Sequence, residues 1–174
     1  AIEADISDVE AVARTITSEY LINMGADRFY QVIRFADPAL LEIFDFDYLH
    51  GDSSALDDPS ALLITESTAI KYFGKADAVG EVVTLDNEFD FYVSAVIADL
   101  PLNTHFNSSP VVDAAFEIVA PIQALTRTRD FDVAGDWNNL SIGNMTYVML
   151  PPELDGDWLK VQMDALYDRI VDEE

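Results

Sequence analysis

The chain has 174 residues, of which 50% are hydrophobic and 11% are aromatic. This length suits one domain or two small lobes that share a core, and the composition argues against disorder, because the apolar side chains can offset the entropy of ordering. The 33 acidic residues outnumber 9 basic ones, for a formal net charge of -24, so duplex DNA and anionic lipid surfaces would repel the domain and nucleic acid is not expected as a partner.

The acidic residues are spread from Glu3 to Glu174 and form no single dense tract. Dispersed acidity is typical of a solvated surface, and we interpret it as a sign of a salt-adapted source, with a cation-binding surface as the alternative. The chain contains no cysteine, which excludes disulfides, thiolate zinc sites and a cysteine nucleophile. Without a ~20-residue apolar run, a signal peptide or an initiator Met, we interpret the chain as a piece of a larger protein.

The first predicted elements are two β-strands joined by a turn. Residues 9–22 and 27–35 are rich in β-branched side chains, which favours strands. Gly25 and Asp27 stand between the two runs, as is typical of a turn.

A short helix is predicted next, over residues 37–46. Asp37 is a plausible N-cap and Pro38 suits the first helical position. Residues 47–60 are dense in Asp, Ser and Gly, and this composition predicts a loop.

The clearest junction between a strand and a helix follows in residues 61–74. The apolar run 62–64 predicts the strand, and Thr65 is the expected N-cap of the helix. We expect Ile70 and Phe73 to point inward and Gly74 to end the helix.

Residues 81–100 predict a β-hairpin, with a tight turn over 86–90 between two strands. In the second strand five apolar residues alternate with other residues, so they are expected to share one face. They are Phe89, Phe91, Val93, Ala95 and Ile97.

The last third of the chain predicts a strand within 111–121, a short helix over 122–129, a loop over 132–144 and a strand over 145–150. Strands and helices interleave without strict alternation, which predicts a mixed α+β fold.

Residues 151–174 predict an amphipathic helix. Asp155 or Asp157 is expected at its start, where a negative charge complements the helix dipole. The apolar side is predicted to carry Trp158, Val161, Leu166, Ile170 and Val171.

Sequence motifs for catalysis are absent. The chain has no G-x-x-x-x-G-K-[ST] phosphate loop, no G-x-G-x-x-G dinucleotide motif and no G-x-S-x-G nucleophile elbow. Any two of the 33 carboxylates could pair as in a glycosidase, but none is singled out. We therefore predict a non-enzymatic protein without catalytic, cofactor-binding or metal-binding residues, and the substrate-binding residues are unknown.

One acidic stretch, "DFDYLHGD", is a candidate metal site because it offers Asp45, Asp47, His50 and Asp52. An EF-hand loop needs an oxygen ligand at its fifth position and Gly at its sixth. Here these positions hold Leu49 and His50. We therefore favour a structural loop over a specific metal site.

The stretch "ADLPLNTHF", residues 98–106, contains the second of two histidines, His105. It is either the edge of an active site or a structural turn. Pro101 is expected to end the preceding strand, because proline cannot donate to a ladder. We favour a turn in which His105 bonds to neighbouring backbone and Phe106 returns the chain to the core.

Three segments, 44–52, 61–86 and 91–106, occur in an order and at spacings that resemble a known family. Their motifs are "FDFDYLHGD", "ALLITESTAIKYFGKADAVGEVVTLD" and "FYVSAVIADLPLNTHF". The ordered set resembles the MacB-like periplasmic core domain of FtsX-type ABC transporter permeases. The departures are modest: Ala78 stands where the family usually has Pro, Glu81 where it often has Lys, and Thr104 where Ser is common.

The resemblance implies a domain at the periplasmic face of the bacterial inner membrane, between the first and second transmembrane helices of a membrane-embedded permease. It implies a porter-like lobe from residues 1–17 and 110–174, with an inserted β-rich lobe over 18–109. The expected role is mechanical: the domain couples membrane-helix movement to the handling of a substrate or partner.

The resemblance also implies partners for the domain. The expected ones are a separate ATPase domain or subunit and either a periplasmic adaptor or a second permease copy. A secreted acidic binding or adhesion module is the alternative function, and a carboxylate-based hydrolase is a distant third.

Overall fold

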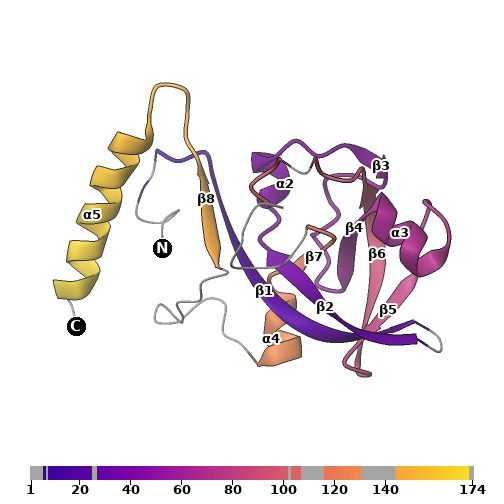
Figure 1. Cartoon of the computed structure of the whole chain (residues 1–174). Helices are drawn as coiled ribbons and strands as arrows, with labels where there is room; N and C mark the ends of the chain where they lie inside the picture. The colour runs from indigo at the N-terminus through magenta and orange to yellow at the C-terminus, as the bar shows by residue number, and fades with distance from the viewer. Residues whose placement is uncertain are drawn as a thin grey trace.

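The computed structural model describes residues 6, 8–24, 27–101, 103–106, 116–130 and 144–172. Figure 1 shows their strands and helices. The strands are β1 (Ala11–Met24), β2 (Asp27–Ala36), β3 (Tyr48–His50), β4 (Ala61–Thr65), β5 (Val82–Leu85), β6 (Phe89–Ile97), β7 (Ile118–Pro121) and β8 (Met145–Met149). The helices are α2 (Leu40–Ile43), α3 (Glu66–Phe73), α4 (Ala124–Arg129) and α5 (Gly156–Asp172).

This element order confirms the mixed α+β prediction. The structure corrects one stretch, because residues 47–60 were predicted to be loop and contain β3, which pairs with β6. A three-residue strand carries too little alternation to stand out in the sequence, and its hydrogen bonds come from a distant partner. Gly25 of the first turn and residues 132–143 of the predicted loop lie outside the described residues.

The strands form one sheet that curls back on itself. The order β2-β7-β4-β6-β5-β1 closes into a circuit, because β1 also pairs with β2. β8 extends the sheet on one side of β1, and β3 pairs with β6. The long β1–β2 pair, antiparallel over ten residue pairs, is the largest part of the circuit.

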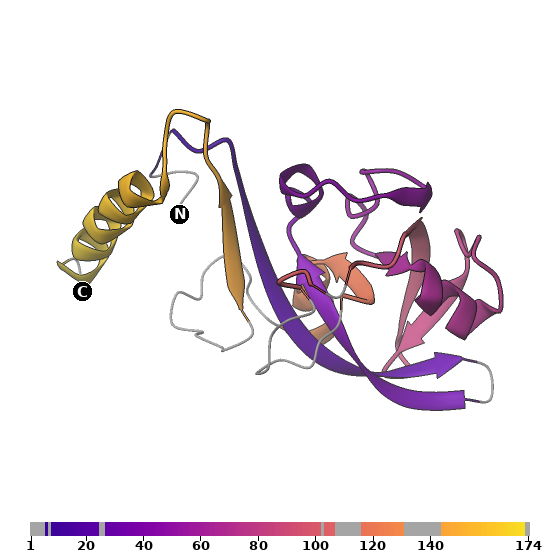
Figure 2. The ribbon, with the colours of Figure 1, turned by 45° about the horizontal axis from the view of Figure 1, so that its top comes forward.

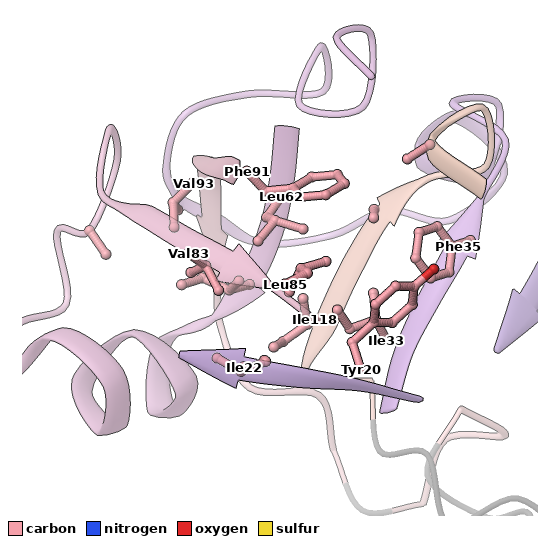
Figure 3. Packing of buried hydrophobic residues seen from close by; sticks show 14 of the residues in the cluster. Tyr20, Ile22, Ile33, Phe35, Leu62, Val83, Leu85, Phe91, Val93 and Ile118 are labelled. Atoms are coloured by element: carbon pink, nitrogen blue, oxygen red, sulfur yellow. The ribbon is translucent and has the colours of Figure 1, made fainter. Parts of the chain in front are cut away.

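The inside of the curled sheet is the main hydrophobic core. Side chains from six strands point toward one another there, as Figure 3 shows. The β1–β2 pair supplies Tyr20, Ile22, Ile33 and Phe35, and the other four strands supply Leu62, Val83, Leu85, Phe91, Val93 and Ile118. Burial of this apolar surface is the main driving force for closing the circuit.

A second core covers the opposite face of β4, β6 and β7, and includes Leu63, Ala95, Ile97 and Val119. The prediction that Phe89, Phe91, Val93, Ala95 and Ile97 share one face is therefore wrong, because the first three face the main core and the last two face the second core. The register with β4 shifts by one residue at Ser94, since Leu62 pairs with Val93 and Leu63 with Ala95. A bulge of this kind moves every later side chain to the other face.

Helix α3 ends as predicted and begins differently. Gly74 adopts the left-handed conformation at its C-cap, with φ of 70°. Thr65 stands at the N-cap but makes no capping bond through its side chain, because its hydroxyl donates to Thr68 at 2.9 Å. Ile70, predicted to point inward, is 51% exposed; the inward side of α3 carries Thr68 and Ala69 instead.

Helix α2 is much shorter than predicted and has no side-chain cap. The Asp37 carboxylate accepts bonds from Nε and Nη2 of Arg14 in β1, at 2.8 and 3.0 Å, so it is not available to cap a helix. The chain becomes extended again at Phe44, with φ of -118° and ψ of 132°. The prediction of a helix over 37–46 is therefore wrong outside 40–43.

Helix α5 confirms the predicted start, because Trp158 N donates to Asp155 Oδ1 at 2.9 Å. Leu166 is buried as predicted, but Val161 is 63% exposed and does not belong to the buried side. The side chains of Ile170 and Val171 lie outside the described residues. In both views α5 lies beyond β8, away from the curled sheet (Figures 1 and 2). None of the described helices is long and apolar enough to span a membrane.

The expected boundaries of the two lobes run through continuous structure. Strand β1 crosses residue 18 without a break, and β7, which belongs to the part over 110–174, pairs with β2 and β4 of the other part. The division into two lobes stays a prediction.

Candidate functional site

The acidic stretch over 45–52, which the structure describes in full, does not form a metal site. His50 Nδ1 lies 3.8 Å from Asp77 Oδ1. Asp52 Oδ1 accepts hydrogen bonds from the backbone N and Oγ of Ser54, at 2.9 and 2.6 Å, and these bonds lower the pKa of Asp52. Within the described ranges, no group of three or more His, Asp or Glu residues is placed to hold a metal ion.

The stretch 98–106 contains a structural turn, and one of its side chains caps helix α3. Asp99 Oδ1 accepts bonds from the backbone N and Oγ of Ser67, at 3.3 and 2.7 Å, and so caps α3 in place of Thr65. Thr104 N donates to Pro101 O at 3.2 Å and closes the turn. Strand β6 ends at Ile97, so Pro101 does not end it directly.

His105 packs against aromatic rings, whereas the sequence predicted bonds to neighbouring backbone. Its ring centroid lies 4.0 Å from that of Phe106, 5.4 Å from Phe44 and 5.5 Å from Tyr147. Desolvation by its neighbours, together with the positive charge of Arg34, lowers the pKa of His105. The side chain therefore sits neutral against the rings at neutral pH.

These rings belong to a larger set that we call the aromatic junction, because it joins four separate segments. Phe44 is central: its ring meets Phe106 at 5.0 Å and Tyr147 at 5.1 Å, both edge to face. Phe116 stacks on Phe46 at 5.3 Å and lies 4.7 Å from Phe106. The junction consists of Phe44, Phe46, His105, Phe106, Phe116 and Tyr147.

Phe106 confirms the prediction that the turn returns the chain to the core, since it is only 6% exposed. Phe44 and Phe46 follow α2, and Phe116 precedes β7. Tyr147 comes from β8, so the junction brings β8 into contact with the turn over 98–106. Edge-to-face and offset ring pairs each add stability beyond the area that they bury.

A buried arginine lies beneath the junction. Arg34 of β2 is 6% exposed, and its guanidinium carbon lies 5.8 Å from the Phe106 ring centroid and 6.0 Å from that of Phe116. Its Nη1 donates to Thr15 Oγ1 of β1 at 3.5 Å. Burial lowers the pKa of Arg34, while Tyr147 acts in the opposite direction; the group keeps its proton in the working pH range.

Arg34 and Tyr147 were missed by the sequence reasoning. A signal for Arg34 was present, because it lies between Ile33 and Phe35 in an apolar strand pattern. Tyr147 carried none, since its ring partners Phe44, His105 and Phe106 lie between 41 and 103 residues earlier in the chain. The junction consists of aromatic rings packed around one imidazole, with the positive charge of Arg34 beneath them.

Three solved structures that are similar to the chain come from membrane transport proteins. A domain of a protein described as a permease from Porphyromonas gingivalis has a TM-score of 0.68 and 23% identity, over 97% of this chain and 67% of its own. The periplasmic region of MacB from Actinobacillus actinomycetemcomitans has a TM-score of 0.70 and 13% identity, over 97% and 70%. The extracellular domain of the noncanonic ABC-type transporter YknZ from Gram-positive bacteria has 0.60 and 14%, over 90% and 72%. No curated protein sequence matches the chain.

The family model for the MacB-like periplasmic core domain matches residues 1–166, which is nearly the whole chain. These likenesses confirm the family that segments 44–52, 61–86 and 91–106 indicated. Permeases of this family work with an ATPase, and their core domain lies on the periplasmic side of the membrane. The chain belongs to the MacB-like periplasmic core domain family of ABC transporter permeases.

Proposed function

We propose that this domain transmits movement of the permease's membrane helices to the periplasm and performs no chemistry of its own. The observation that carries the proposal is the aromatic junction, in which Tyr147 of β8 packs edge to face on Phe44 at 5.1 Å. Through it, the last strand of the chain is held against the turn over 98–106.

The β1–β8 pair is suited to act as a lever. β1 has 14 residues and, at ~3.3 Å per residue, is about 46 Å long. β8 pairs with its first part in five consecutive pairs, from Ala11–Met149 to Thr15–Met145, and α5 follows β8. In a domain that lies between two transmembrane helices, movement of those helices would reach this lever through the residues that precede β1 and through α5, which follows β8.

Besides the pairing of β1 with β2 and β5, two side-chain contacts join the lever to the segments around α2 and to the turn over 98–106. One is the aromatic junction, which acts by packing. The other is the pair of Arg14 in β1 with Asp37 before α2, in which the Arg14 backbone N also donates to Asp37 Oδ2 at 2.9 Å. A bidentate pair fixes orientation as well as distance, so bending of the lever is passed on rather than lost in a loose loop.

This role gives the two expected lobes a mechanical meaning. The porter-like lobe, 1–17 with 110–174, would contain the start of β1, with β8 and α5, and would move with the membrane helices. The inserted lobe, 18–109, would contain α3 and the β5–β6 hairpin and would present the moving surface. Its partner would be a periplasmic adaptor or a second permease copy, and a separate ATPase domain or subunit would drive the cycle.

The chain contains no cysteine, so introduced cysteines are its only labelling sites. The experiment uses a permease whose cysteines outside this domain have been replaced. We would place one spin label at V161C in α5 and one at E88C in the exposed β5–β6 turn, and measure their distance in the whole permease with its ATPase. Addition of a non-hydrolysable ATP analogue should shift the distance distribution. A control pair, D57C with E88C, lies within 18–109 and should not shift. An unchanged distance for the first pair in a nucleotide-bound transporter would refute the proposal.

A further inference from the structure

The circuit of strands is closed by a short seam between β1 and β5. Only two residue pairs form it, Ile22 with Leu85 and Asn23 with Thr84. By contrast, ten pairs join β1 to β2 and four join β5 to β6. Within the circuit, only the β4–β7 contact has as few pairs. Strands β4 and β7 are buried over their whole length, whereas Asn23 and Thr84 of the seam are partly exposed, so the seam is the weakly paired contact that water can reach.

The β5–β6 turn reinforces the seam through Asp86. This residue adopts a left-handed conformation, with φ of 52°. Its backbone N donates to Leu21 O at 2.8 Å, and its Oδ1 accepts from Leu21 N at 2.9 Å. The next residue, Asn87, accepts a bond from Asn23 Nδ2 at 3.0 Å. The turn thus bonds to β1 beyond the last strand pair.

Arg129, the last residue of α4, bonds to both sides of the contact between the β5–β6 turn and β1. Its Nη1 donates to Asp86 Oδ2 at 2.7 Å and its Nη2 to Glu19 O at 2.6 Å, while the guanidinium lies 3.8 Å from the Tyr20 ring centroid. Burial raises the pKa of Asp86, but the bonds from Arg129 and Leu21 outweigh it and lower the pKa overall.

We propose that Asp86 and Arg129 form a latch, and that the curled sheet opens at the β1–β5 seam when the latch is released. Both side chains are about one-third exposed, so water can compete for their bonds, whereas Ile22 and Leu85 behind them are fully buried. Opening would expose part of the apolar interior to a periplasmic partner.

The latch is also placed to respond to the lever. Arg129 ends α4, and the next described element along the chain is β8. Arg129 also bonds to Glu19 O in β1, the strand that pairs with β8, so displacement of the β1–β8 lever would act on the Arg129 bonds. This physiological role rests on the proposed coupling function, but the latch itself can be tested without it.

The latch test is amide hydrogen exchange, followed by NMR on the 174-residue chain. Leu21 and Asp86 report on the seam, and Ile122, whose N donates to Ala36 O at 2.8 Å, reports on the distant β2 side. The seam amides should exchange faster than Ile122. R129M should speed them by about tenfold, the effect of 1.4 kcal/mol, and leave Ile122 unchanged.

A matched control removes an exposed ion pair elsewhere. K75M breaks the pair of Lys75 with Glu81, at 2.6 Å, and should leave all three amides unchanged. If R129M leaves the seam amides unchanged, or speeds the Leu21, Asp86 and Ile122 amides by one common factor, the seam does not open separately and the latch is refuted.

A second measurement separates the latch from the coupling function. In the whole permease, deuterium uptake over 82–89 should rise in one nucleotide state, and a disulfide between N23C and T84C, which are directly paired, should abolish the rise. If the spin-label distance changes with nucleotide but uptake over 82–89 never does, coupling stands and the latch falls. If neither changes, the proposed function falls while the exchange result on the isolated chain still decides the latch.

Discussion

Phe106→Ala tests whether the aromatic junction holds the domain together. Phe106 is 6% exposed and has ring contacts at 4.7 Å with Phe116 and 5.0 Å with Phe44. Loss of a buried phenylalanine removes about 1.5–3 kcal/mol of transfer free energy. The cavity left among rings that cannot collapse adds to this, so the total expected loss of unfolding free energy is about 3–4 kcal/mol.

The assay is urea unfolding followed by circular dichroism, with the m-value compared between variants. Tyr30→Ala is the matched control, because Tyr30 is an aromatic residue that is 70% exposed; its loss should change the unfolding free energy by no more than about 0.5 kcal/mol. A loss below about 1 kcal/mol for Phe106→Ala, with an unchanged m-value, would refute the view that the junction is a tightly packed core.

Three further predictions concern the turn, the histidine and the charge. Asp99→Ala should cost about 1 kcal/mol of unfolding free energy, because Ser67 loses its cap bonds; no loss in urea unfolding would mean that Asp99 is not the cap. Burial and Arg34 lower the pKa of His105, so the unfolded chain takes up the proton first and stability should fall as pH drops through about 6.5. His105→Gln should reduce that loss between pH 7.5 and 5.5, and an equal loss in both proteins would contradict the assignment. The excess of 33 acidic over 9 basic residues predicts that moderate NaCl raises the thermal midpoint by screening repulsion; a flat or falling midpoint would argue against salt adaptation.

Local patterns in the sequence were sufficient for most strands, for the C-terminal end of α3 and for the start of α5. Gly74 could be assigned because a left-handed C-cap favours glycine, and Asp155 because a carboxylate just before the first residue of a helix can cap its N-terminus. Both signals lie within a few residues of the element that they define.

The features that sequence reasoning missed depend on distant partners. Asp99 caps a helix that begins 33 residues earlier, and the bulge at Ser94 appears only when β6 is aligned with β4. Ile70 fits a helical apolar pattern yet faces outward, because Thr68 and Ala69 occupy the buried side of α3. Tertiary contacts override local pattern in each case.

One part of the candidate site could be predicted from local sequence, and the other part depends on distant residues. The stretch over 98–106 could be identified as a structural turn from its own residues. The aromatic junction could not, because Tyr147 and Arg34 reach it from strands far away in the chain. Strand alternation places Arg34 on one face of β2, but only the fold shows that this face lies beneath Phe106.

The most direct test of the central claim is the spin-label measurement between V161C and E88C in a permease that also carries Phe44→Ala. Phe44 packs edge to face on both Tyr147 of β8 and Phe106 of the turn, at 5.1 and 5.0 Å, which are shorter than the direct contacts of Tyr147 with the turn at 5.5 and 5.9 Å. Its loss should therefore uncouple the lever from the sheet. We expect ATP hydrolysis to continue while the nucleotide-dependent shift in the distance distribution disappears, and Tyr30→Ala to leave the shift intact. A shift of normal size in the Phe44→Ala permease would contradict the claim that the aromatic junction transmits movement.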